Sequence, residues 1–143
     1  MKIKICAVLA AAGLLTGLAS HAGETPAPEG AKLYFINPPN GATVSSPVMV
    51  QFGLSGMGVA PAGVVKENTG HHHLFVDAPL PEGAALNEAI LKDEHHLHFG
   101  GGQTEAMVTL TPGKHTLQLL LGDHNHIPHK TPVASAPITI NVN

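Results

Sequence analysis

The chain has 143 residues, and its ten acidic side chains outnumber its seven lysines, giving a formal net charge of −3 at pH 7. It contains no Arg, no Trp and a single Tyr, so it lacks the positive surface that binds phosphates and the aromatic side chains that stack on bases. We therefore expect no nucleic-acid partner. Cys6 is the only thiol, which excludes an intramolecular disulfide and a Cys-ligated zinc site.

The first 22 residues have the features of a secretory signal peptide. Lys2 and Lys4 precede an apolar run over 5–18, and Ser20 and Ala22 form a small-x-small cleavage site. The apolar run is too short for a permanent transmembrane anchor, and no Cys follows it for lipid attachment. We therefore predict that residues 1–22 are cleaved and that a periplasmic or secreted protein with no stable membrane anchor remains.

After this segment, residues 23–30 (GETPAPEG) are rich in Pro, Glu and Gly, which predicts a flexible leader. Residues 31–143 are predicted to be one histidine-rich domain built from short strands, because apolar residues alternate between clusters of turn residues. The expected strands lie at 32–36, 48–54, 71–77, 97–99, 103–110, 115–121 and 138–142. Residues 84–91 are the only helical candidate in this region.

The number and spacing of these strands indicate an all-β fold. About seven short strands in this length are typical of an immunoglobulin-like antiparallel β-sandwich. A cupredoxin-like barrel is the alternative that the pattern leaves open. In either fold, alternation places one set of side chains in the core, including Val48, Val50 and Phe52 on one strand and Leu117 and Leu119 on another.

Ten histidines occur between residues 71 and 129. Residues i and i+2 of a strand share a face at a spacing of roughly 6.5–7 Å, so a His-x-His pair can bind one metal ion. His71 with His73 and His96 with His98 are two such pairs. The apolar alternation predicts that all four face solvent, whereas His72 faces the core.

Strand order brings a third group close to the first. In the immunoglobulin arrangement, the start of the 71–77 strand and the end of the 115–121 strand lie at the same end of the domain. We therefore expect His71 and His73 to approach the loop that carries His124, His126 and His129. His115, at the opposite end of its strand, is instead expected to bond nearby backbone at a corner of the sandwich.

These arguments predict a metal site and no catalytic residues. The expected ligands are His71, His73, His96, His98, His126 and His129, with His72, His124 and Asp123 as weaker candidates. Imidazole ligands without thiolate favour copper or zinc over calcium or magnesium. The glycines at 100–102 are expected to allow a close backbone approach beside His98.

Three functions remain open. The first is a non-catalytic periplasmic module that buffers, carries or delivers copper or zinc, with a periplasmic metal-handling protein as its partner. The second is an immunoglobulin-like adhesion or assembly module whose histidines are structural. The third is a copper-dependent redox enzyme resembling superoxide dismutase, although the disulfide and the substrate-steering Arg of that family are missing.

Three strings resemble a bacterial envelope family known as domain of unknown function 4399. They are GHHHLFVD at 70–77, HLHFGGGQTE at 96–105 and PGKHTLQLLLGDHNHIPH at 112–129. The resemblance extends from about Tyr34 to Val142, and it implies a shared histidine site without naming its chemistry. The family pattern includes the following histidines of this chain: His71, His72, His73, His96, His98, His115, His126 and His129. His95 and His124 stand outside that pattern.

Overall fold

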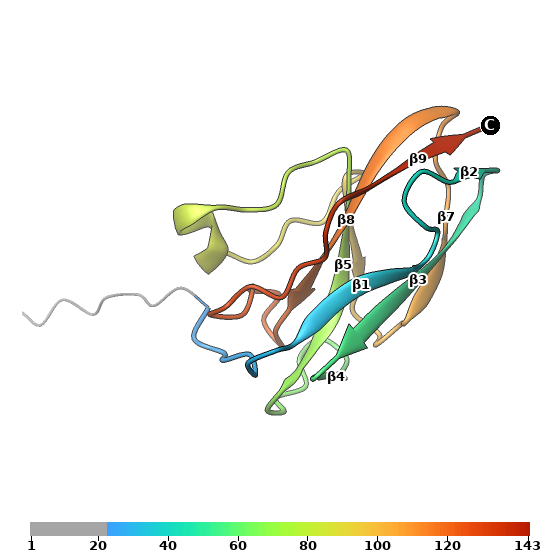
Figure 1. The fold of residues 1–143 in the computed structure, drawn as a ribbon. Coiled ribbons are helices and arrows are strands. Elements are labelled where there is room, and N and C mark those ends of the chain that lie inside the picture. Colours follow the sequence, from blue (N-terminus) through green and yellow to red (C-terminus); the bar gives the residue numbers. More distant parts are fainter. Residues whose placement is uncertain (1–22) are drawn as a thin grey trace, which may run out of the picture.

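The computed structural model describes residues 23–143, so the predicted signal peptide lies outside the described residues (Figure 1). The described chain is all-β, with nine strands in two sheets and one short 3-10 helix. The strands are β1 (Lys32–Asn37), β2 (Thr43–Val44), β3 (Val48–Ser55), β4 (Gly58–Val59), β5 (Thr69–Val76), β6 (His96–Phe99), β7 (Glu105–Val108), β8 (Gly113–Gly122) and β9 (Ile138–Val142). The helical candidate at 84–91 is a single 3-10 segment, η1 (Gly83–Asn87).

The seven strands of four or more residues are those that the apolar alternation predicts. They form a small sheet in the order β1-β3-β7 and a larger one in the order β2-β9-β8-β5-β4, with β6 also paired to β5. The larger sheet curls around the small one (Figure 1).

The prediction of a purely antiparallel sandwich is wrong at two places. β2 pairs with β9 in parallel, and β4 pairs with β5 in parallel. Both added strands have only two residues, which is too short to show alternation in the sequence. β4 joins the larger sheet because the chain leaves β3 through Gly56, whose φ of 79° allows a sharp change of direction.

The core lies between the two sheets and consists of the side chains that alternation places there. Val50 of β3, Leu117 and Leu119 of β8 and Ile140 of β9 are completely buried. Phe52, on the same face of β3, is also buried and packs its ring on that of His72, at a centroid distance of 4.9 Å. The predicted inward position of His72 is therefore confirmed.

β5 is buried along its whole length, on both faces. His71 and His73 do point away from the core, but each is only 1% exposed, so the prediction that they face solvent is wrong. Three loops cover this outer face and bond to one another: the amide of Ala62 donates to the carbonyl of Gly100 at 2.8 Å, and that of Gly63 to the carbonyl of His124 at 2.9 Å. These covering loops depend on tertiary contacts, so the alternation of apolar and polar residues along β5 could not predict them.

Residues 23–30, the predicted leader, lie against the loop that follows β8. The amide of Lys130 donates to the carbonyl of Thr25 at 3.0 Å, and the Thr25 hydroxyl donates to Asp123 at 2.7 Å. These contacts tie the start of the described chain to the loop that contains His126. Within residues 23–143, no helix has the length and apolar character needed to cross a bilayer.

Candidate metal centre

Four imidazole rings pack together on the outer face of β5. His71 and His73 come from β5, His98 from β6 and His126 from the loop after β8; we call these four residues the imidazole cluster. The ring-centroid distances are 4.8 Å for His71–His73, 5.0 Å for His71–His98, 5.0 Å for His71–His126, 5.0 Å for His73–His98, 6.1 Å for His73–His126 and 4.7 Å for His98–His126. Every ring is therefore close to the other three.

Strand register brings these segments together. His98 pairs directly with His73 across the β5–β6 ladder, and His71 lies two residues earlier on the same face of β5. On the other side of β5, Gly122 at the end of β8 pairs with His71, so the following turn carries His126 over the same face. The predicted approach of His126 to His71 is thus confirmed.

The turn that carries His126 is organised by Asp123, which is only 3% exposed. Its Oδ1 accepts hydrogen bonds from the amides of Asn125 and Ile127, at 2.8 and 3.0 Å, and its Oδ2 accepts the Thr25 hydroxyl. The amide of His126 donates to the Asp123 carbonyl at 3.0 Å, and His126 has a φ of 68°. Asp123 therefore positions His126 through the backbone of the turn. No pattern in the sequence indicated that Thr25 would hydrogen-bond to Asp123.

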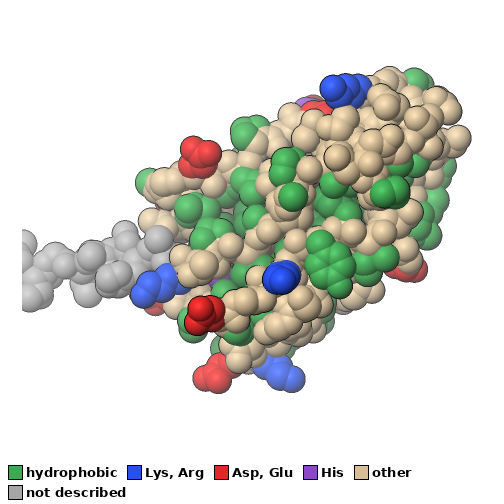
Figure 2. Space-filling model, viewed as in Figure 1, with side chains coloured by type: hydrophobic (Ala, Val, Ile, Leu, Met, Phe, Trp, Pro, Cys, Tyr) green, Lys and Arg blue, Asp and Glu red, His purple; other side chains and the backbone are tan. Residues whose placement is uncertain are grey.

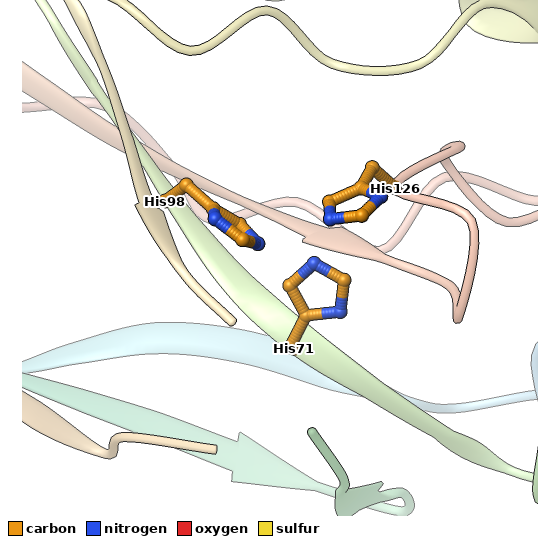
Figure 3. Close-up of side chains that lie close together, drawn as sticks. All are labelled: His71, His98 and His126. Atoms are coloured by element: carbon orange, nitrogen blue, oxygen red, sulfur yellow. The ribbon is translucent and has the colours of Figure 1, made fainter. Parts of the chain in front are cut away.

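Figure 3 shows the rings of His71, His98 and His126 converging, with one nitrogen of each turned toward the space between them. One potential ligand atom from each of these residues lies within 4.8 Å of the other two. These three side chains could therefore hold a metal ion. Almost no His surface is visible on the face formed by β1 and β3 (Figure 2), because the cluster lies on the far side of β5.

Several nitrogens of the cluster have no hydrogen-bond partner among residues 23–143. They are Nδ1 of His71, Nδ1 of His73 and Nε2 of His98, all of them buried. The Nε2 atoms of His71 and His73 lie 3.0 Å apart, so one of them donates its hydrogen to the other. Buried polar atoms are normally paired. An ion between the rings would give Nε2 of His98 a partner, whereas the Nδ1 atoms of His71 and His73 point away from the Nε2 atoms that meet.

Burial keeps His71, His73 and His98 neutral at pH 7. It lowers the pKa of His71 to about 4 and that of His73 to about 2, and neighbouring histidines of the cluster lower both further. Burial and the proximity of His126 also lower the pKa of His98. The negative charge of Asp123 acts in the opposite direction on His71, but with a smaller effect. Neutral imidazole is the form that binds metal ions.

Three histidines predicted as ligands lie outside the cluster. His96 turns to Asp93, whose Oδ1 accepts its Nδ1 hydrogen at 2.7 Å. The Nε2 of the buried His129 donates to the carbonyl of Thr69 at 3.2 Å. His72 faces the core, where its Nδ1 donates to the carbonyl of Gln103 at 3.1 Å.

The other weaker candidates are also engaged elsewhere. The ring of His124 bonds the side chain of Asn125 at 3.0 Å, and Asp123 is occupied by the turn described above. His115 takes the corner position that the sequence predicts: its Nε2 donates to the carbonyl of Thr111 at 2.8 Å and its Nδ1 donates to Asp77 at 2.7 Å. These two bonds raise the pKa of His115.

Gly100 provides the close backbone approach that was expected beside His98. A Cβ atom at Gly100 would lie 2.5 Å from Nε2 of His98, which is closer than side chains tolerate. At Gly101, the nearest atoms belong to the flexible Gln103 side chain, 3.2 Å away. The backbone at Gly100 therefore packs directly against a ring of the imidazole cluster.

We expect Gly100→Ala to weaken zinc binding about 10-fold, because the added methyl group displaces the His98 ring without removing it, an effect similar to losing a residue that orients a ligand. Isothermal titration calorimetry with Zn(II), after removal of bound metal by a chelator, measures the change in affinity. Gly101→Ala is the matched control and should bind as the unmutated protein does. Equal affinities for the two variants would contradict this role of Gly100.

No curated protein and no solved structure matches the chain. The family described as Domain of unknown function (DUF4399) matches residues 50–143, a range that contains every residue of the imidazole cluster. Because this match covers most of the sequence, the chain belongs to the DUF4399 family.

Proposed function

We propose that this protein is a periplasmic or secreted metal-binding module that holds copper or zinc at His71, His98 and His126. Its task in this proposal is to buffer the ion, carry it, or deliver it to a periplasmic metal-handling protein. The compartment follows from the signal peptide predicted over residues 1–22. The choice of metal follows from a donor set made only of imidazole.

The observation that carries this proposal is that the potential ligand atoms of His71, His98 and His126 lie within 4.8 Å of one another, and that burial lowers the pKa of His71 and His98. Three segments far apart in the sequence each contribute a ring to this site; His71 is buried, and His98 and His126 are partly exposed. A purely structural polar network satisfies its own donors and acceptors, whereas Nε2 of His98 is buried without a partner among the described residues. This favours an ion over the adhesion-module alternative, and no contact described above favours the redox enzyme.

The fold supports a further part of the proposal, namely that the domain is a variant of the immunoglobulin-like sandwich. Seven longer strands in two sheets and the corner formed by His115 and Thr111 fit that arrangement. The two short parallel strands are the departures from it.

Metal titration of the protein lacking its signal peptide tests the function. After treatment with a chelator, Zn(II) and Cu(II) should each bind at one ion per chain. His98→Ala and His126→Ala should each weaken binding by about 100-fold or more, beyond the usual effect of a residue that only orients a ligand. Circular dichroism of each variant checks that the fold persists.

Two neighbouring histidines are the matched controls. His96 lies two residues from His98 on β6, and His124 lies two residues from His126 in the same loop, but neither belongs to the imidazole cluster. His96→Ala and His124→Ala should therefore bind both ions as the unmutated protein does. Absence of binding by the unmutated protein, or equal losses in the controls, would refute the proposed site.

A further inference from the structure

We infer that His73 is a fourth ligand and that the imidazole cluster is a closed, nearly tetrahedral four-imidazole site for a d¹⁰ ion, Zn(II) or Cu(I). This inference rests on the proposed function and adds to it the coordination number and the class of ion. The proposed function needs only three ligands, with a fourth position left to water. A closed site excludes that water and indicates storage or transfer of the ion rather than catalysis on it.

The spacing of ligand rings depends on coordination geometry. With metal–nitrogen bonds of about 2.0–2.1 Å, each ring centre lies roughly 3.2 Å from the ion, so a tetrahedral site separates all six pairs of centres by about 5.2 Å. A square-planar site, which Cu(II) and Ni(II) favour, gives four separations of about 4.5 Å and two of about 6.4 Å between opposite rings.

The observed spacings match the tetrahedral pattern better. Five of the six centroid distances lie between 4.7 and 5.0 Å, and only the His73–His126 distance is long, at 6.1 Å. In a square plane with His73 opposite His126, His71 would lie opposite His98 at a similarly long distance. That second pair is separated by only 5.0 Å.

The nitrogen atoms support the same assignment. In a tetrahedral site the ligand nitrogens lie about 3.3–3.4 Å apart, and the Nε2 atoms of His71 and His73 are 3.0 Å apart. A hydrogen on one of these two atoms bridges them, and an ion bound between them would take its place. His73 does not belong to the group of ligand atoms that lie within 4.8 Å of one another, so it becomes a ligand only if its ring and that of His126, 6.1 Å apart, move closer on metal binding.

Gly122 makes room for His73. A Cβ atom at Gly122 would lie 2.8 Å from Nε2 of His73 and 3.4 Å from Cα of His126. Any larger residue at this end of β8 would press the His73 ring away from its present place. The absence of a side chain at Gly122 leaves Nε2 of His73 beside Nε2 of His71.

X-ray absorption spectroscopy of the Zn(II)-loaded, unmutated protein tests the inference without any substitution. We expect four imidazole ligands and no oxygen ligand. The Cu(II) form should show the small parallel hyperfine splitting of a tetrahedrally distorted site, and Ni(II) should bind more weakly than Zn(II). Three imidazoles with a water ligand, or a tetragonal Cu(II) spectrum, would overturn the inference while leaving the proposed function intact.

A matched pair of variants provides a second test. His72 and His73 are adjacent on β5 and equally buried, but only His73 belongs to the imidazole cluster. His73→Gln should reduce Zn(II) affinity at least about 100-fold and weaken the visible absorption that tetrahedral Co(II) produces, whereas His72→Gln should leave both unchanged. Unchanged affinity and an unchanged Co(II) spectrum in folded His73→Gln would overturn the inference.

Separate titrations with Zn(II) in air and with Cu(I) under anaerobic conditions, each against a competing chelator, decide which d¹⁰ ion is held more tightly. Binding of either ion in a four-imidazole site supports the inference. If the unmutated protein binds none of these ions, the proposed function itself is refuted. If it binds an ion with fewer than four imidazole ligands, only the inferred coordination number is wrong.

Discussion

Acidification from pH 7.5 to 4.5 should lower the free energy of unfolding of the metal-free protein by about 5 kcal/mol, which is a large part of the stability of a small domain. The reason is that the folded chain keeps His71 and His73 neutral, with pKa values lowered to about 4 and about 2. In the unfolded chain both titrate near the ordinary pKa of 6.5. Each group then contributes about 2–3 kcal/mol over this range.

The sign of this pH dependence follows from whether the folded or the unfolded state binds more protons. Between pH 6.5 and about 4 the unfolded state binds more protons at His71 than the folded state does, so stability rises with pH and is lost on acidification. His115 has the opposite sign, because its raised pKa makes its protonated form stabilising at pH values below 6.5. It offsets part of the loss. The lowered pKa of Asp77 acts only at more acidic pH, below its ordinary value of 3.8.

Urea unfolding in the presence of a chelator, at several pH values between 7.5 and 4.5, measures this loss. His73→Gln removes one of the buried groups and should reduce the pH-dependent loss, although burial also lowers the pKa of His72 and of His98 and part of the loss remains. His115→Gln removes the offsetting group and should make the loss larger. A stability curve that stays flat over this range would show that the cluster does not exclude protons.

Asp123→Ala is the second substitution from which we expect a large effect, a loss of about 3 kcal/mol in the free energy of unfolding and a 10–100-fold weaker affinity for Zn(II). The buried carboxylate accepts hydrogen bonds from Asn125, Ile127 and Thr25. Removing it leaves two amides and one hydroxyl without their acceptor. The turn can then no longer hold His126 over the other rings.

Chemical unfolding and Zn(II) titration of the same variant measure the two effects. Asp77→Ala is the control, since Asp77 also accepts a backbone amide, that of Thr116, and the ring of His115. These residues lie at the opposite end of β8 from the imidazole cluster. Asp77→Ala should therefore lower stability and leave Zn(II) affinity unchanged. Unaltered affinity in Asp123→Ala would show that the turn does not position His126.

The alternation of apolar and polar residues was sufficient to predict the longer strands and their inward faces, because successive side chains of a half-buried strand point in turn to the core and to the surface. Val48 and Val50 on β3 and Ile138 and Ile140 on β9 follow this rule. The two short parallel strands follow no such pattern. They form where loops happen to run beside β9 and β5, and only the folded structure determines those contacts.

The candidate site was predictable only in part. The approach of His126 to His71 follows from strand order, which a fold class fixes. The place of His98 depends on its register against His73, which no local pattern specifies. His96 and His129 have the same residue type and similar spacing, but Asp93 and the Thr69 carbonyl engage them instead. A count of histidines cannot reveal such competing partners.

The enclosure of β5 on both faces has a kinetic consequence. One face of this strand packs in the core and the other lies beneath loops that bond to one another. His71 and His73 are thereby closed off from solvent, whereas His98 and His126 remain partly exposed, so an ion would meet these two rings first. Exchange of the ion would then proceed in steps, with the two outer rings releasing it last to solvent or to a partner protein.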